Sequence, residues 1–174
     1  MILTIALLVI FPAIMALAAS SDLFTMTISN RLTLALAASF FVMAPLVGLG
    51  LEQILWHVAA GALVLVVTFA FFAQGWIGGG DAKLAAATAL WLGFGEVFPY
   101  LLYASLFGGI LTFIIIQFRQ FALPAFAARQ EWIGRLHEKN GGVPYGIALA
   151  VSALMVYPET VWIKTADMAR LIAG

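Results

Sequence analysis

The chain has 174 residues, of which 64% are hydrophobic and 9% are charged, whereas a typical soluble domain is about 45–50% apolar and about 25% charged. A fold of this size cannot hide so much apolar surface from water. The composition therefore excludes a water-soluble enzyme, a disordered tail and a nucleic-acid-binding protein. Eight basic and eight acidic residues cancel, so no net charge indicates an anionic partner, and there is no cysteine for a disulfide or a zinc site. This pattern is typical of a small integral membrane protein.

Six apolar segments are candidates for bilayer-spanning helices, since one crossing needs about 20 mostly apolar residues. They cover residues 2–19, 32–51, 54–74, 84–95, 97–118 and 143–157, and the fourth and the sixth are the shortest. A glycine-rich loop, Gly75 to Asp81, precedes the fourth segment. The first segment lacks the basic start of a cleaved signal peptide, so we expect it to remain as a helix. The sequence thus predicts one all-α, polytopic membrane domain over residues 1–174.

Two further segments have mixed polarity. Residues 119–142 combine charged side chains with aromatic and aliphatic ones, which is typical of an amphipathic helix lying on a membrane surface. Residues 158–174 show a shorter version of the same pattern and are predicted to form a second interfacial helix.

The positions of lysine and arginine predict the orientation. Six of the eight follow the first, third and fifth segments: Arg31, Lys83, Arg119, Arg129, Arg135 and Lys139. The odd-numbered loops are therefore expected in the cytoplasm, with both termini on the outer side. Asp22 and Asp81 then both face the cytoplasm.

These two aspartates are the most informative ionisable residues. Asp81 ends the glycine run before a short apolar segment, and Asp22 lies three residues past the first one. Two carboxyls brought together cannot both ionise cheaply, so the pair would share one proton. One carboxylate can then deprotonate a water while the other carboxyl protonates a peptide carbonyl. Alternatively, both aspartates could simply end or cap helices, and the glycines could serve close helix packing.

Three blocks of sequence surround or follow the two aspartates. The first, Gly78 to Leu84, reads GGGDAKL and resembles the GxGD signature, with its following lysine, of the type IV prepilin peptidases. Asp22 to Leu32, reading DLFTMTISNRL, resembles the second family block, and Val143 to Gly146 resembles the proline-tyrosine-glycine start of the last core helix. The blocks occur in the family's order, and the resemblance covers nearly the whole chain.

This resemblance implies a six-helix intramembrane aspartic endopeptidase of the bacterial inner membrane that needs neither a metal nor another cofactor. Asp22 and Asp81 would be the catalytic pair. Gly78 and Gly80 would shape the chain under Asp81, and Lys83 and Asn30 would support the site or contact substrate. The implied substrate is a prepilin, a transmembrane helix with a short basic leader that is cut at the cytoplasmic face. The pilus assembly machinery is a further potential partner.

The chain also departs from the family pattern. Ile28-Ser29-Asn30 lacks the proline of the family block, and Thr25 to Thr27 stand where basic residues are common. No cysteine-containing cytoplasmic insertion is present, as in the short type associated with tight-adherence (Flp) pili, so N-methylation of the new pilin terminus is not expected. Archaeal preflagellin peptidases are similar. Outside this family, the alternatives are a small proton-coupled transporter, because membrane aspartates also relay protons, and a non-catalytic secretion-assembly scaffold.

Overall fold

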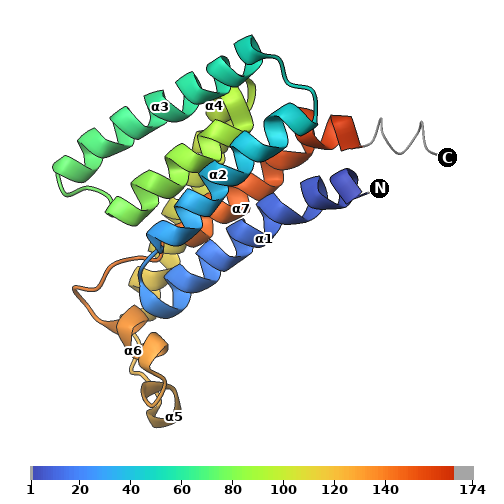
Figure 1. Ribbon diagram of the computed structural model, residues 1–174. Helices are drawn as coiled ribbons and strands as arrows, with labels where there is room; N and C mark the ends of the chain where they lie inside the picture. The colour runs from blue at the N-terminus through green and yellow to red at the C-terminus, as the bar shows by residue number, and fades with distance from the viewer. Residues whose placement is uncertain (1, 167–174) are drawn as a thin grey trace.

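The computed structural model describes residues 2–166, and all of their regular secondary structure is helical (Figure 1). The elements are α1 (Ile2–Thr25), α2 (Asn30–Leu46), α3 (Leu51–Ala73), α4 (Gly79–Phe118), α5 (Ala125–Ala128), α6 (Glu131–His137), α7 (Gly146–Val156) and the 3-10 turn η1 (Tyr157–Glu159). Of these, α1, α3 and α4 are long and apolar enough to cross a membrane, while α2 and Gly146–Glu159 are shorter apolar helices. The all-α, polytopic prediction is confirmed.

The central helix α4 contains both the fourth and the fifth predicted segments. Its 40 residues are interrupted at Gly93, whose φ of 67° and ψ of 175° are not helical. Glycine adopts this left-handed region without the penalty that a Cβ atom imposes. The interruption lies before the predicted boundary at Glu96, and the helix begins at Gly79 rather than at Leu84. The first half of α4 is therefore longer than the sequence predicts.

Helix α4 is also the centre of the packing, with α2, α3 and α7 all in contact with it, whereas α2 and α3 hardly touch each other. The core beside its interruption is aromatic. Phe11 stacks on Tyr157 with ring centroids 4.3 Å apart, and the Trp91 and Trp162 rings are 4.6 Å apart. Since buried aromatic side chains remove large apolar areas and pair favourably, these contacts tie α1, α4 and the segment after η1 together.

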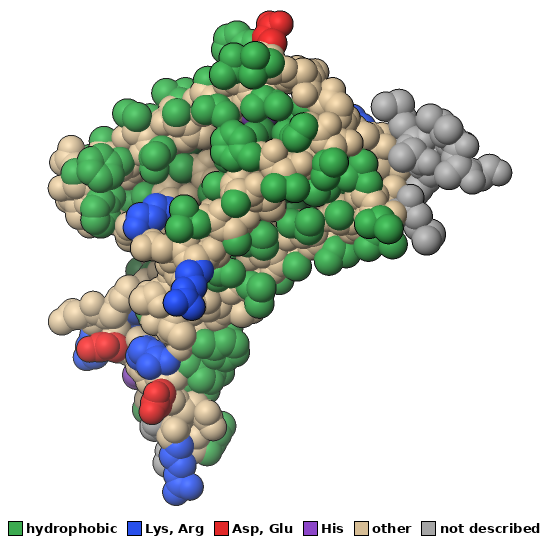
Figure 2. Space-filling model, viewed as in Figure 1, with side chains coloured by type: hydrophobic (Ala, Val, Ile, Leu, Met, Phe, Trp, Pro, Cys, Tyr) green, Lys and Arg blue, Asp and Glu red, His purple; other side chains and the backbone are tan. Residues whose placement is uncertain are grey.

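The outer surface of the helical body is apolar. Leu34, Val66 and Phe98 are 67%, 67% and 75% exposed on α2, α3 and α4. Figure 2 shows hydrophobic side chains spread over this body, while most of the charged side chains in that view gather on the protrusion that carries α5 and α6. Exposed apolar area on this scale indicates contact with lipid rather than with water.

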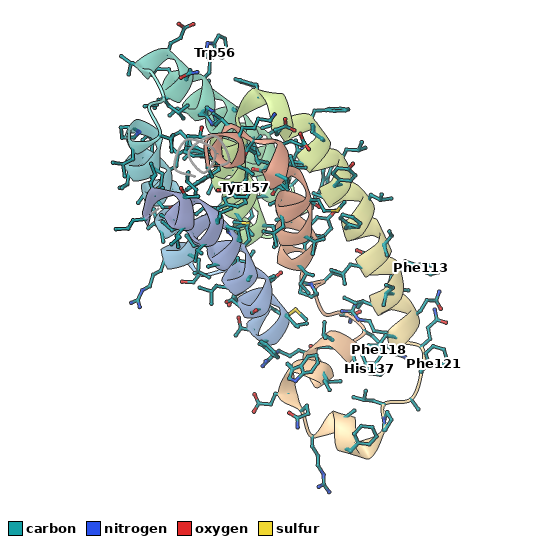
Figure 3. The ribbon with its side chains drawn as sticks, turned by 90° about the vertical axis from the view of Figure 1, so that its right-hand side faces the viewer. Trp56, Phe113, Phe118, Phe121, His137 and Tyr157 are labelled. Atoms are coloured by element: carbon teal, nitrogen blue, oxygen red, sulfur yellow. The ribbon has the colours of Figure 1, made fainter. Side chains whose placement is uncertain are left out.

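The connector over residues 119–142 differs from the single amphipathic helix that the sequence predicts. It forms the two short helices α5 and α6. Pro124, which lacks a backbone N–H and cannot sit inside a helix without cost, lies just before α5 and keeps the first part of the connector out of a helix. His137 hydrogen-bonds through Nε2 to the Phe121 carbonyl at 2.7 Å, and its ring packs edge-on against Phe118 (Figure 3). Arg119 donates to the Leu136 carbonyl at 2.8 Å. The connector is thus tied to the end of α4.

The segment after η1 also differs from the expected interfacial helix. Residues 161–166 are helical, but Trp162 is completely buried. Its Nε1 donates to the Trp91 carbonyl at 2.6 Å. The rest of the predicted tail helix, residues 167–174, lies outside the described residues. Within the described part, the tail contributes a core side chain rather than only a surface face.

Candidate active site

Both aspartates line one cleft of about 360 Å³ at the end of the bundle next to α6. Asp22 belongs to the last turn of α1, and Asp81 is the third residue of α4. The cleft brings together all six residues singled out from the sequence: Asp22, Asn30, Gly78, Gly80, Asp81 and Lys83. Met26, Thr27 and Ile28, from the turn between α1 and α2, complete its wall with Gly79.

Asp22 is held by the start of α7. Asp22 is only 5% exposed, and its Oδ2 accepts the backbone N–H of Gly146 at 2.7 Å. Gly146 is the first residue of α7, and the first N–H groups of a helix have no partner within the helix. The partial positive charge at a helix N-terminus also favours a nearby carboxylate. The contact therefore both orients Asp22 and stabilises its ionised form.

Only glycine fits at position 146 without a shift of its neighbours. A Cβ atom there would lie 2.8 Å from Ile28 Cδ1 and 2.9 Å from Asp22 Oδ2. The sequence supplies the Val143–Gly146 block only as a family resemblance, and Gly146 is not among the predicted site residues. Pro144 is a local signal of a helix start, but nothing in the local pattern connects that start with Asp22.

Asp81 lies in the first turn of α4 and not on a loop. The loop before α4 ends at Gly78, which is the N-cap residue, so Gly79 and Gly80 are already helical. This corrects the expectation of a glycine loop reaching to Asp81. An acidic side chain in the first turn stabilises the positive end of a helix, so Asp81 favours a helix start at this place. The Asp81 carboxyl turns back over the N-cap, since a Cβ atom on Gly78 would lie 2.8 Å from Oδ2.

The two family-like blocks touch each other beside the aspartates. A Cβ atom on Gly80 would lie 3.1 Å from Ile28 Cβ, so the glycine permits a close approach of the two chain segments. Lys83 Nζ donates to Asn30 Oδ1 at 2.9 Å and links α4 to the first turn of α2. These contacts hold the segment that follows Asp22 against the segment that contains Asp81.

The charges in the cleft are two carboxyls and one ammonium group. Lys83 forms no ion pair with either aspartate, and in residues 2–166 the single ion pair is Arg135–Glu131 at 3.8 Å. No hydrogen bond joins the two aspartates in this part of the chain, although they are near enough to interact electrostatically. Like charges so placed favour a state in which the pair holds one proton. Among the described residues, no three His, Asp or Glu side chains form a group able to hold a metal ion.

Comparison with known protein families matches residues 9–113 to the type IV leader peptidase family. The matched range contains both aspartates, the glycine run and the interruption at Gly93. Neither the curated proteins nor the solved structures that were compared gave a match.

Proposed function

Because the chain belongs to the type IV leader peptidase family, we propose that it is an aspartic endopeptidase that removes the leader of type IV, Flp-like prepilins at the cytoplasmic face of the bacterial inner membrane. The observation that carries this proposal is the shared cleft of Asp22 and Asp81, which come from two different helices. Hydrolysis by two carboxyls needs a base and an acid at one peptide bond, and this cleft is where two carboxyls of the chain meet.

Each aspartate accepts one backbone N–H, Asp22 from Gly146 and Asp81 from Gly78, and the pair holds one proton. We assign Asp22 as the base and Asp81 as the carrier of the shared proton. Asp22 takes a proton from water while the water oxygen bonds to the peptide carbon, and Asp81 donates its proton to the carbonyl oxygen. The resulting diol collapses when Asp81 takes back a hydroxyl proton. The C–N bond then breaks, and Asp22 gives its proton to the leaving amine.

The orientation is supported by the charges around the cleft. The connector with its basic residues packs against the same end of α1, where the Phe24 and Trp132 rings are 5.6 Å apart. Arg135 donates a hydrogen bond to the Phe24 carbonyl. Basic segments next to membrane helices remain in the cytoplasm, so the cleft opens to the side on which a prepilin leader lies.

The test is cleavage of an epitope-tagged Flp-type prepilin co-expressed in membranes, read as a shift in gel mobility. Wild type should shorten the prepilin, whereas Asp22→Asn and Asp81→Asn should leave it whole, since loss of a catalytic acid or base costs about 10²–10⁴-fold. Glu52→Gln is the matched control, because Glu52 is an exposed acid in the first turn of α3, outside the cleft. Cleavage by both aspartate variants at wild-type rate would refute the proposed mechanism.

A further inference from the structure

A second, larger hollow of about 520 Å³ lies between α2 and α3 and is floored by α4. We call it the lateral groove. Asn30 and Lys83 line both this groove and the aspartate cleft. The groove therefore adjoins the candidate active site, and the hydrogen-bonded Asn30–Lys83 pair lies where the two hollows meet.

Each helix presents one face to the lateral groove. On α4 the lining residues are Lys83, Ala86, Ala87 and Leu90, and a spacing of three and four residues places them in one stripe. The same spacing starts at Asn30 on α2 and at Val58 on α3. Three helical stripes thus converge on a space that no other described helix of the chain fills, which is the arrangement of a bundle open to one more helix.

The floor and walls of the groove suit the close approach of a helix. Ala86 and Ala87 are buried in its floor on α4, Gly61 is buried on α3, and Ala37 and Ala62 line its sides. In membranes, helices associate through small residues that let backbones approach. From Lys83 to Leu90 the lined stretch of α4 spans about 10 Å, so the groove accommodates about two turns of an added helix.

The charge at the junction indicates what that helix carries. Lys83 contacts the neutral Asn30 and is 2.9 Å from its Oδ1, while no carboxylate in residues 2–166 lies within ion-pair distance of its ammonium group. An anionic group on the occupant would complement this cation. A helix that lies in the groove also ends at the cleft, which puts the peptide bond beyond its end beside Asp22 and Asp81.

We infer that the lateral groove is the seat of the substrate's apolar helix, and that Lys83 pairs with a substrate carboxylate at the end of that helix nearest the cleaved bond. This inference rests on the proposed peptidase function and adds how the substrate is held. An anionic phospholipid would also satisfy Lys83, but it would not account for the position of the groove next to the cleft of the two aspartates.

Cysteine crosslinking tests the inference, because the chain has no cysteine of its own. Ala62 and Ala70 are both exposed on α3, and only Ala62 lines the groove. Ala62→Cys and, as control, Ala70→Cys are each combined with Asp22→Asn so that the substrate stays whole. Each is oxidised with copper phenanthroline in membranes that contain a Flp-type prepilin with one cysteine at successive helix positions, and adducts are resolved on non-reducing gels.

We expect Ala62→Cys to form adducts at prepilin positions three to four residues apart, as one helix face requires, and the adducts to be lost with Ala70→Cys. Lys83→Met and removal of the substrate carboxylate should each lower the yield of the adduct, and the two changes combined should lower it no further than either alone. Lys83→Arg keeps the positive charge and should give the wild-type yield. Equal adducts at both sites, or none at position 62, would overturn the inference. So would a photoactivatable phosphatidylglycerol that labels position 62 and is not displaced by prepilin. Adduct formation does not require cleavage, so this result is independent of the Asp22→Asn and Asp81→Asn cleavage test.

Discussion

Helix α4 has two places where backbone groups lack partners within the helix. They are its start at Gly78–Asp81 and its interruption at Gly93, and the surroundings of the two places differ. At Gly93, side chains from other segments satisfy the carbonyls around the break. At the start of α4, polar side chains face an open cleft. Both places are rich in glycine, so glycine alone does not distinguish a structural break in a helix from a candidate catalytic site. The polar atoms around the glycines make that distinction.

The break at Gly93 is closed by two hydrogen bonds. The Leu90 carbonyl is 2.8 Å from His57 Nδ1, and the Trp91 carbonyl accepts from Trp162 Nε1 at 2.6 Å. Trp91 is itself fixed, since its Nε1 donates to the Leu36 carbonyl at 2.7 Å. A backbone carbonyl left without a partner inside a bilayer costs several kcal/mol. These bonds therefore make the break a rigid part of the fold.

The start of α4 is held by fewer contacts. Asp22 has the Gly146 N–H as its hydrogen-bond partner, and Lys83 has Asn30. Asp81 turns its carboxyl back to the Gly78 N–H at the start of its own helix, and the cleft beside both carboxyls is open to water or substrate. The first half of α4 therefore has a rigid break at one end and an open polar cleft at the other. This division is expected if the break stabilises the fold and the cleft is the catalytic site.

The largest effect is expected at the contact that holds Asp22. In Gly146→Ala the new Cβ atom meets Ile28 and Asp22 at less than 3 Å, so the carboxyl must move. A displacement of about 1 Å can cost about 10²-fold in rate, and we expect a loss of this size in the prepilin gel-shift assay. Gly142→Ala is the control, because its Cβ atom would have no neighbour within 4 Å. Wild-type cleavage by Gly146→Ala would mean that α7 does not position Asp22.

A smaller effect, on stability, is expected at the closed break. Trp162→Phe keeps an aromatic ring in the core but leaves the Trp91 carbonyl without its donor. An unpaired buried polar group costs about 1–3 kcal/mol, so the midpoint of thermal unfolding in detergent should fall. Trp56→Phe is the matched control, since Trp56 lies beside the same break but is 59% exposed, and its Nε1 donates no hydrogen bond to the described residues (Figure 3). If the two variants unfold at the same temperature, the hydrogen bond does not stabilise the break.

The apolar segments and the two aspartates could be predicted from the sequence because each depends on local composition or on a short motif. The Asp22–Gly146 contact could not, since it joins residues 124 positions apart and depends on how α1 and α7 pack. Nor could the hydrogen bonds of His57 and Trp162, because the sequence predicts only an interfacial helix for the segment that contains Trp162. Their partners are carbonyls that become available only because α4 breaks at Gly93, and apolar periodicity does not report a positive φ. For the same reason the predicted boundary fell at the charged Glu96.

The smallest effect is expected on the stability of the turn that follows α1, beside Asp22. Met26 follows α1, lines the cleft and is the non-glycine residue with positive φ in residues 2–166, at 54°. Its N–H donates to the Asp22 carbonyl at 2.8 Å and ends the helix there. A left-handed conformation costs an L-residue about 1–2 kcal/mol, whereas glycine's entropy loss on folding offsets about 0.5–1 kcal/mol of any gain. Met26→Gly should therefore raise the unfolding midpoint slightly, while Met26→Leu, which keeps a Cβ atom, should not.

If Met26→Gly also keeps full prepilin cleavage, the strained backbone at Met26 affects only the end of α1. If Met26→Gly is more stable but cleaves less prepilin, the turn at Met26 helps to position Asp22, independently of the break at Gly93.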